Sequence, residues 1–262
     1  MFDLELSGKV ALVTGGSDGL GRAAAHRLAA EGALVVICGR RAAHAQQAAK
    51  DMTAAVQASN NNGGQVVGLR ADVTNAEDCD ALIAEIEHRH GGIDILINNA
   101  GASAAMGLAL VEDDLWLSDF NLKVMAAVRL SRLAIPMMVA RGGGTIFNLA
   151  SSAGIRWDMS GYGAYGAVKQ ATRALTRAGA AEWGRQGIRV LTIAPHAESP
   201  GLKWWIENNP EEATAFFKTI PLGRIGKLEE DIGRAVVTLC GPDMGYLTGT
   251  TIPLDGGQAN FD

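Results

Sequence analysis

The sequence predicts an α/β fold, in which a doubly wound parallel sheet of about seven strands carries helices on both faces. Short runs rich in Val, Ile and Leu alternate along the chain with longer, Ala-rich segments. Because these runs are apolar almost throughout, they fit strands that are buried on both faces. The length of 262 residues suits one domain, so we expect residues 1–262 to form a single unit.

Each element of this fold has its own signal. Continuous apolar runs predict strands over residues 9–14, 34–38, 66–69, 93–97, 145–149, 189–193 and 251–254. Helical spacing predicts helices over residues 21–31, 41–58, 76–90, 111–140, 163–183 and 229–240. Residues 195–222 interrupt the alternation with prolines and aromatic residues. We expect this segment, the substrate loop, to carry short helices over a site.

Composition limits the partners and the compartment. The net charge is −5 and the Lys and Arg residues do not cluster, so a nucleic-acid partner is not expected. No apolar run approaches the roughly 18 residues of a membrane span. The three cysteines are far apart and odd in number, and the first residues do not resemble a secretory signal. We therefore expect a cytoplasmic protein without a disulfide framework, metal site or membrane contact.

A glycine-rich turn follows the first predicted strand. Gly15, Gly19 and Gly21 lie where this strand gives way to a helix. Gly15 would form the tight turn, Gly19 would let an anion approach the backbone, and Gly21 would let the helix pack against the strand. N–H groups at the helix start would then face a pyrophosphate. The spacing is not that of the G-x-G-x-x-G fingerprint, so a plain strand-to-helix connection remains the alternative.

Polar residues also follow the third and fourth strands. Asp72 and Asn99 lie at the carboxyl ends of these strands, where ligands bind in open α/β sheets. Each has a structural alternative: Asp72 could cap the helix that begins near Asn75, and Asn99 could tie neighbouring strand ends together. The structural and binding roles are compatible.

A tyrosine and a lysine share one helix face. Tyr165 and Lys169 are four residues apart, a spacing that also occurs in ordinary surface contacts. Hydride transfer to a carbonyl needs a proton donor, and the ordinary Tyr pKa of about 10 is high for that task. A nearby ammonium would lower it. Ser151 or Ser152, at the end of a strand, would bind the substrate oxygen.

With these residues assembled, the chain resembles the short-chain dehydrogenase/reductase family over nearly its whole length. The matching blocks are Thr14-Gly-x-x-x-Gly-x-Gly21, Asp72, Asn98-Asn-Ala-Gly101, Asn121, the serine after the fifth strand, Tyr165-x-x-x-Lys169 and Leu247-Thr-Gly-x5-Asp255-Gly-Gly257. The resemblance implies a Rossmann-like fold and a dimer or tetramer.

The resemblance also implies residue roles. Tyr165 would be the acid/base, Lys169 would bind the nicotinamide ribose and lower the Tyr pKa, and Asn121 would support a proton-relay water. The register from Asn148 selects Ser151 as the catalytic serine, whereas the spacing to Tyr165 selects Ser152; we favour Ser151. The coenzyme would contact Gly15, Ser17, Asp18, Gly19, Leu20, Gly21, Arg40, Arg41, Asp72, Val73, Asn99, Ala100, Gly101, Tyr165, Lys169 and Pro195.

Residues at the end of the second strand indicate which coenzyme, NADP(H) or NAD(H), the protein prefers. Gly39 stands where relatives that prefer NAD usually have an acid, and Arg40 follows it. The Arg fork suits a 2′-phosphate, which favours NADP(H). Arg40 could instead simply solvate a helix start, and Asp18 stands where relatives that prefer NADP often have a basic residue. NAD(H) therefore remains the alternative.

The substrate loop departs from the family pattern. After Pro195 the usual Gly is His196, which could touch substrate or coenzyme, although a packing role is the simpler interpretation. Further substrate contacts are expected from Ser152, Trp157 and Trp204. The aromatic and apolar residues of the expected pocket wall are Trp157, Met159, Trp204, Trp205, Phe216 and Phe217.

These residues indicate a function. The wall suits an apolar ketone or secondary alcohol of aromatic, alicyclic or steroid-like form, although it could equally bury the loop. We expect an NADP(H)-dependent oxidoreductase that interconverts such a pair, as a homotetramer or homodimer. The alternatives are an NAD-linked alcohol dehydrogenase, an enzyme like the 3-oxoacyl reductases, or a nucleotide-sensing protein without turnover.

Overall fold

A seven-stranded parallel sheet forms the centre of the computed structural model, which describes residues 3–59, 63–101, 106–155 and 161–259. The strand order is β3-β2-β1-β4-β5-β6-β7, which confirms the expected doubly wound architecture. The order reverses between β1 and β4, and ligands bind at such a switch point. The strands are β1 (Val10–Thr14), β2 (Leu34–Gly39), β3 (Gln65–Arg70), β4 (Ile95–Asn98), β5 (Gly144–Leu149), β6 (Ile188–Pro195) and β7 (Thr251–Leu254).

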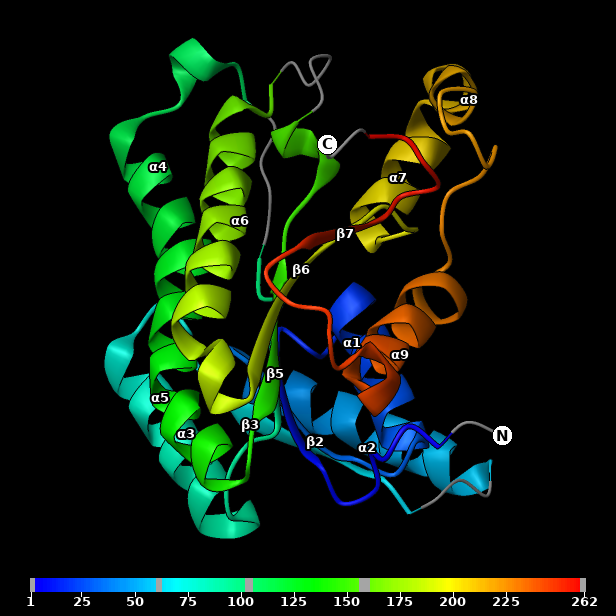
Figure 1. Cartoon of the computed structure of the whole chain (residues 1–262). Coiled ribbons are helices and arrows are strands. Elements are labelled where there is room, and N and C mark those ends of the chain that lie inside the picture. The colour runs from blue at the N-terminus through cyan, green and yellow to red at the C-terminus, as the bar shows by residue number, and fades with distance from the viewer. Residues whose placement is uncertain (1–2, 60–62, 102–105, 156–160, 260–262) are drawn as a thin grey trace.

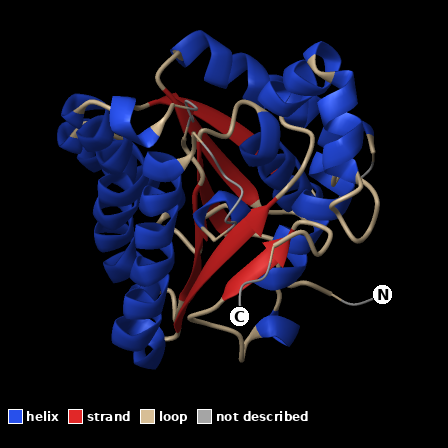
Figure 2. Cartoon of the chain, turned by 90° about the horizontal axis from the view of Figure 1, so that it is seen from above, coloured by secondary structure: helices blue, strands red, loops and turns tan. Residues whose placement is uncertain are grey.

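Helices cover both faces of the sheet (Figures 1 and 2). Side chains on β1 alternate between two apolar cores, with Ala11 and Val13 in one and Val10 and Leu12 in the other. The first core contains α1 (Gly19–Ala30), α2 (Ala42–Ala58) and α9 (Arg234–Cys240). The second contains α3 (Ala76–His90), α5 (Ala126–Ala140) and α6 (Gly163–Trp183). Burial on both sides explains why the strands are apolar throughout.

Two of the expected helices contain π-helical turns. The helix expected over residues 111–140 is divided into α4 (Asp113–Phe120), the π-helix η2 (Asn121–Met125) and α5. The N–H of Ala126 donates to the Asn121 carbonyl five residues earlier. The helix expected over residues 229–240 likewise begins with a π-helix, η5 (Leu228–Gly233), before α9. Apolar spacing continues through both turns, so it does not reveal the extra residue that a π turn holds.

The substrate loop carries two short helices at one end of the sheet, α7 (Pro200–Asn208) and α8 (Pro210–Phe217) (Figure 1). Both start at a proline, whose fixed φ suits the first helical position. The Ser199 side chain caps α7 by accepting from the Leu202 N–H at 3.2 Å. The short helices expected in this segment are therefore present, and their position over a site stays a prediction.

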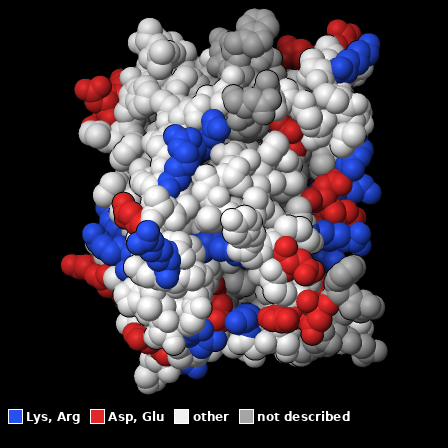
Figure 3. All heavy atoms as spheres, viewed as in Figure 1, with Lys and Arg blue, Asp and Glu red and all other residues white. Residues whose placement is uncertain are grey.

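The surface shows mixed charge. Acidic and basic side chains are interspersed on the face in Figure 3, with uncharged areas between them. Among the helices that the structure describes, none has the length and apolar character that crossing a membrane requires.

Candidate active site

The turn between β1 and α1 has the geometry of an anion-binding site. Gly15 and Gly19 have φ angles of +63° and +53°, which other residues rarely adopt. Asp18 stands at the N-cap of α1, but its carboxylate lies 2.6 Å from His44 Nε2 and makes no bond to the helix start. The first turn of α1 contains no acidic residue. Its N–H groups can therefore bind a pyrophosphate, whose charge the helix dipole stabilises.

Asn99 ties the end of β4 to this turn. Its side-chain amide donates to the carbonyls of Thr14 at 2.8 Å and Gly15 at 3.1 Å, and its N–H donates to Thr14 Oγ1 at 3.0 Å. A Cβ on Gly21 would lie 2.4 Å from the Asn99 amide nitrogen and 2.6 Å from the Gly15 carbonyl. Glycine at position 21 therefore lets α1 lie close to the residues that follow β1 and β4.

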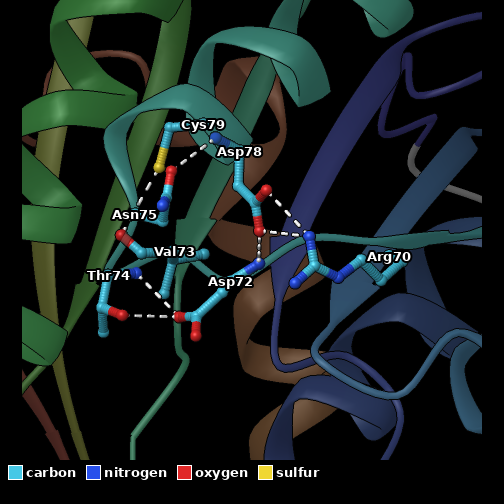
Figure 4. Close-up of polar contacts among 7 residues, drawn as sticks. All are labelled: Arg70, Asp72, Val73, Thr74, Asn75, Asp78 and Cys79. Atoms are coloured by element: carbon cyan, nitrogen blue, oxygen red, sulfur yellow. Dashed lines mark hydrogen bonds and ion pairs between the residues drawn. The ribbon is translucent and has the colours of Figure 1, made fainter.

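Asp72 forms a local turn at the end of β3 (Figure 4). One carboxylate oxygen accepts from the Thr74 N–H at 3.0 Å and the Thr74 hydroxyl at 2.7 Å. These bonds, followed by the charges of Arg40 and Arg70, hold the Asp72 pKa below its usual value. Asn75, not Asp72, caps α3 by accepting from the Asp78 N–H. The Asp72 carboxylate is thus fixed at the same end of the sheet as the glycine turn.

The end of β2 opens to solvent beside that turn. Arg40 and Arg41 are exposed, and Arg41 stands at the N-cap of α2. A Cβ on Gly39 would lie 3.7 Å from Ser17 Oγ, so the two residues face one another. The remaining expected coenzyme residues come from separate parts of the chain: Val73 is buried, Leu20 and Ala100 pack against the two cores, Gly101 is exposed, and Pro195 ends β6.

The structure brings Ser151, Tyr165 and Lys169 together. Tyr165 and Lys169 share one face of α6, and the Lys169 ammonium lies 5.5 Å from the centroid of the Tyr165 ring. Lys169 is buried and donates to the Leu149 carbonyl at the end of β5. Ser151 hydrogen-bonds to Tyr165, whereas Ser152 is buried at the start of a 3-10 turn. The geometry therefore matches the choice of Ser151 from the strand register.

The pKa of Tyr165 departs from expectation. Burial raises it above 10.0, the hydrogen bond from Ser151 opposes this effect, and Asp119 and Tyr162 add to it. Burial also lowers the Lys169 pKa to about 7, with repulsion from Lys123 adding to the shift and Asp119 opposing it. The net shift of the Tyr165 pKa is therefore upward, and the lowering by Lys169 that the family resemblance implies stays a prediction.

Asn121 begins the π-helix, and its side chain faces the Asp72 turn. Its amide donates to the Thr74 carbonyl at 3.2 Å, and its Oδ1 accepts from Arg129 at 2.8 Å. The side chain therefore joins η2 to the turn after β3. The role in supporting a water, which the family resemblance implies, stays a prediction.

Two charged residues near Tyr165 were missed by sequence reasoning. Lys123 is buried, forms an ion pair with Asp119, and its ammonium lies 5.2 Å from the centroid of the Tyr165 ring. Their spacing of four residues is the signal in the sequence, but the same spacing is typical of exposed helix pairs.

The substrate loop is anchored by aromatic contacts. The His196 ring lies 5.2 Å from that of Phe216 on α8, and Phe216 lies 5.7 Å from Trp205 on α7, both edge to face. The His196 N–H donates to the Leu254 carbonyl at 2.9 Å. Trp204 is 64% exposed. Trp157 and Met159 lie outside the described residues, so their expected contact with substrate stays a prediction.

The residues at this edge fit a dinucleotide. A helix start with available N–H groups, glycines in left-handed conformations and a fixed carboxylate occupy the switch point of the sheet. The Tyr165 hydroxyl and Ser151 lie at the end of β5, in the same edge. The arrangement can therefore hold a dinucleotide and exchange a proton with a substrate oxygen.

Comparisons with known proteins agree with this chemistry. A family model described as "Enoyl-(Acyl carrier protein) reductase" matches residues 15–259. Dehydrogenase/reductase SDR family member 4 of Oryctolagus cuniculus is 36% identical, over 96% of this chain and 94% of the relative.

Two solved structures resemble the whole chain. A 7α-hydroxysteroid dehydrogenase complexed with NADH and 7-oxo glycochenodeoxycholic acid is 31% identical, with a TM-score of 0.88 and coverage of 99% of this chain and 98% of that one. L-sorbose reductase from Gluconobacter frateurii, complexed with NADPH and L-sorbose, is also 31% identical, with a TM-score of 0.87 and coverage of 98% of both chains.

Proposed function

Because the chain belongs to the short-chain dehydrogenase/reductase family, we propose that it uses NADP(H) to interconvert an apolar ketone and the corresponding secondary alcohol. Membership of this family makes the protein an NAD(P)-dependent oxidoreductase. The observation that carries the proposal is the hydrogen-bonded pair of Ser151 and Tyr165 beside the buried Lys169. Aromatic, alicyclic and steroid-like ketones are the proposed substrate class.

In the proposed reaction the coenzyme is the hydride donor, and the side chains of the site handle the proton and the charge on the substrate oxygen. A nicotinamide coenzyme held at this edge would supply the hydride for the carbonyl carbon. The Tyr165 hydroxyl then gives its proton to the carbonyl oxygen, which completes the alcohol. Ser151 hydrogen-bonds to the same oxygen as its negative charge develops. Burial raises the pKa of the Tyr165 hydroxyl, which therefore holds its proton until the substrate oxygen accepts it.

Arg40 supports NADP(H) over NAD(H). This exposed residue follows Gly39, which faces Ser17 in the turn before α1, and its charge acts on Asp72, so it lies where the adenosine ribose of a dinucleotide would bind. The Asp18 carboxylate, which would repel a 2′-phosphate, is paired with His44. NAD(H) is the second candidate, because that carboxylate could bind a ribose hydroxyl instead.

Aromatic contacts support an apolar substrate. His196, Trp205 and Phe216 form a connected cluster of half-buried rings in the substrate loop. Such a cluster can bury apolar surface of a ligand. One solved relative binds a steroid and the other a sugar, so the choice between them requires a direct assay.

Initial rates of NADPH and NADH oxidation test the function. The substrates are an aliphatic, an aromatic and a steroidal ketone, together with a 3-oxoacyl thioester and L-sorbose. We expect the highest kcat/KM with NADPH and an apolar ketone, and Tyr165→Phe should lose at least about a thousandfold in kcat while it binds NADPH as the wild type does. Preference for the thioester or the sugar would refute the substrate class. NADPH binding without turnover in either direction would favour the nucleotide-sensing alternative.

Arg40→Ala tests the coenzyme. We expect at least about tenfold weaker NADPH binding and unchanged NADH binding, since only NADPH has the 2′-phosphate. Arg89→Ala, on the exposed side of α3, is the matched control. Equal loss for both coenzymes, or no loss, would contradict the proposed 2′-phosphate contact.

We further propose that a second copy of this chain covers α4. Large apolar side chains are exposed on and around this helix: Leu108, Leu110, Leu115, Leu117, Phe120 and Met125. Exposed apolar surface of this kind is typical of subunit interfaces. Light scattering should show a dimer or tetramer that Leu117→Glu dissociates, whereas Leu222→Glu, at a similarly exposed leucine in the substrate loop, should leave it intact. A monomeric wild type would refute this assembly.

A further inference from the structure

A second buried ammonium lies against Tyr165. Lys123 comes from η2, and its side chain is only 2% exposed. Its Nζ is 5.2 Å from the centroid of the Tyr165 ring, while that of Lys169 is 5.5 Å away. A Cβ on Gly101 would lie 3.6 Å from Lys123 Cε, so the lysine stem also borders the turn after β4. Lys123 therefore lies between this turn and the tyrosine.

Asp119 completes the arrangement. It lies one helical turn before Lys123, forms an ion pair with it, and has a side chain that is 20% exposed. Removing the two charges of an ion pair from water costs several kcal/mol per charge, before the attraction between the charges is counted. Apolar residues of similar volume often stabilise a fold at least equally well. Packing alone therefore does not account for this pair.

Both charges act on the residues that share the site. Asp119 raises the pKa of Tyr165 and of Lys169, whereas Lys123 lowers that of Lys169. Among the described residues, the other groups that affect the Tyr165 pKa are Ser151, from the loop after β5, and Tyr162, from the start of α6. Removing either charge alone would leave the other uncompensated beside Tyr165.

We propose that Asp119 and Lys123 are positioning residues that hold the Tyr165 ring and balance the charge around Tyr165 and Lys169. The lysine contacts the ring face, where a cation is attracted by the π electrons, and the aspartate fixes the lysine. The pair would keep the tyrosine aligned while the substrate oxygen changes its charge. This role rests on the proposed function of Tyr165 as the proton donor.

A series of charge-neutralising substitutions tests the proposal. Lys123→Met leaves Asp119 uncompensated, so the pKa of Tyr165 should rise by about one unit. Asp119→Asn leaves Lys123 uncompensated, so it should fall by about one unit. The double variant should return it close to the wild-type value. A purely structural pair would give no opposite shifts of this kind.

The first readout does not depend on turnover. The near-ultraviolet absorbance of phenolate is titrated in each variant, and the same titration with Tyr165→Phe added isolates the contribution of Tyr165 from those of Tyr162 and Tyr246. The second readout is kcat/KM for ketone reduction against pH, whose fall at high pH should move in the same directions. If the titrations shift as expected but no ketone is reduced, the charge balance stands and the proposed function fails.

Controls keep the outcome decisive. Arg89→Met and Glu85→Gln break an ion pair of the same spacing on α3 and should not shift the titration of Tyr165. Lys123→Gln replaces Lys123→Met if the latter does not fold, because it keeps a donor for Asp119 without the charge. The proposal would be overturned if Lys123→Met and Asp119→Asn shifted the Tyr165 pKa in the same direction, or if neither folded variant shifted it.

Discussion

Replacing Lys169 by Met should stabilise the protein below about pH 7 while it abolishes activity. The buried ammonium has its pKa lowered from 10.5 to about 7. At about 1.4 kcal/mol per pKa unit, this difference means that the charged form of Lys169 costs the folded protein about 5 kcal/mol relative to the neutral form. Met has a similar shape and no charge, but it loses the hydrogen bond to the Leu149 carbonyl, worth about 1 kcal/mol. We expect a net stabilisation of roughly 2–4 kcal/mol near pH 6.

The gain should depend on pH with a definite sign. Between about 7 and 10.5 the unfolded chain holds a proton on this lysine that the folded protein has released. The stability of the wild type therefore rises with pH across this window, and the advantage of Lys169→Met shrinks. Urea unfolding at about pH 6, 7.5 and 9, at one protomer concentration, measures this difference.

Lys50→Met, at an exposed position on α2, is the control and should give a difference that does not change with pH. A Lys169→Met protein that is less stable than the wild type at pH 6, or an advantage that grows toward pH 9, would refute the reasoning. Either result would mean that the buried amine is stabilised by its neighbours rather than held at a cost.

Three further substitutions test other features. Gly21→Ala places a methyl group 2.4 Å from the Asn99 amide nitrogen, so we expect a loss of about 1–3 kcal/mol in thermal unfolding, together with weaker NADPH binding. Asp94→Asn removes the charge of a carboxylate that accepts from Arg141 at 2.8 and 2.9 Å, and urea unfolding should show a loss of about 2–3 kcal/mol. Phe216→Ala should raise KM for an apolar ketone roughly tenfold with little change in kcat, since it removes the ring between the two loop helices; an unchanged KM would separate this ring from substrate binding.

The fold could be predicted because its signals are local. Uninterrupted apolar strands require cover on both faces, and Ala-rich segments of helical length between them provide it. The break at Asn121 could not be predicted in this way. Residues on both sides keep helical spacing, and the hydrogen bond from Ala126 to Asn121 is visible only in the backbone.

The site could be predicted in its composition but not in its electrostatics. The spacing of Tyr165 and Lys169 places both on one helix face, and the end of β5 fixes the register of Ser151. The direction of the Tyr165 shift depends on burial by distant segments, which no local pattern reveals. Lys123 was missed for the same reason, because an aspartate and a lysine four residues apart are typical of solvated helices.

The π-helix at residues 121–125 bears on which genetic changes this protein tolerates. Successive residues of an α-helix are about 100° apart around its axis, and a π turn takes up one extra residue so that the helices on either side of it can keep their faces. Deleting a single residue from η2 would let α4 and α5 join as one regular helix with all its hydrogen bonds made. The Asn121 and Lys123 side chains would then lose their present directions while the sheet and its cores stayed intact. Lineages that descend from such a protein could therefore lose this chemistry by a single in-frame codon deletion and still retain the fold.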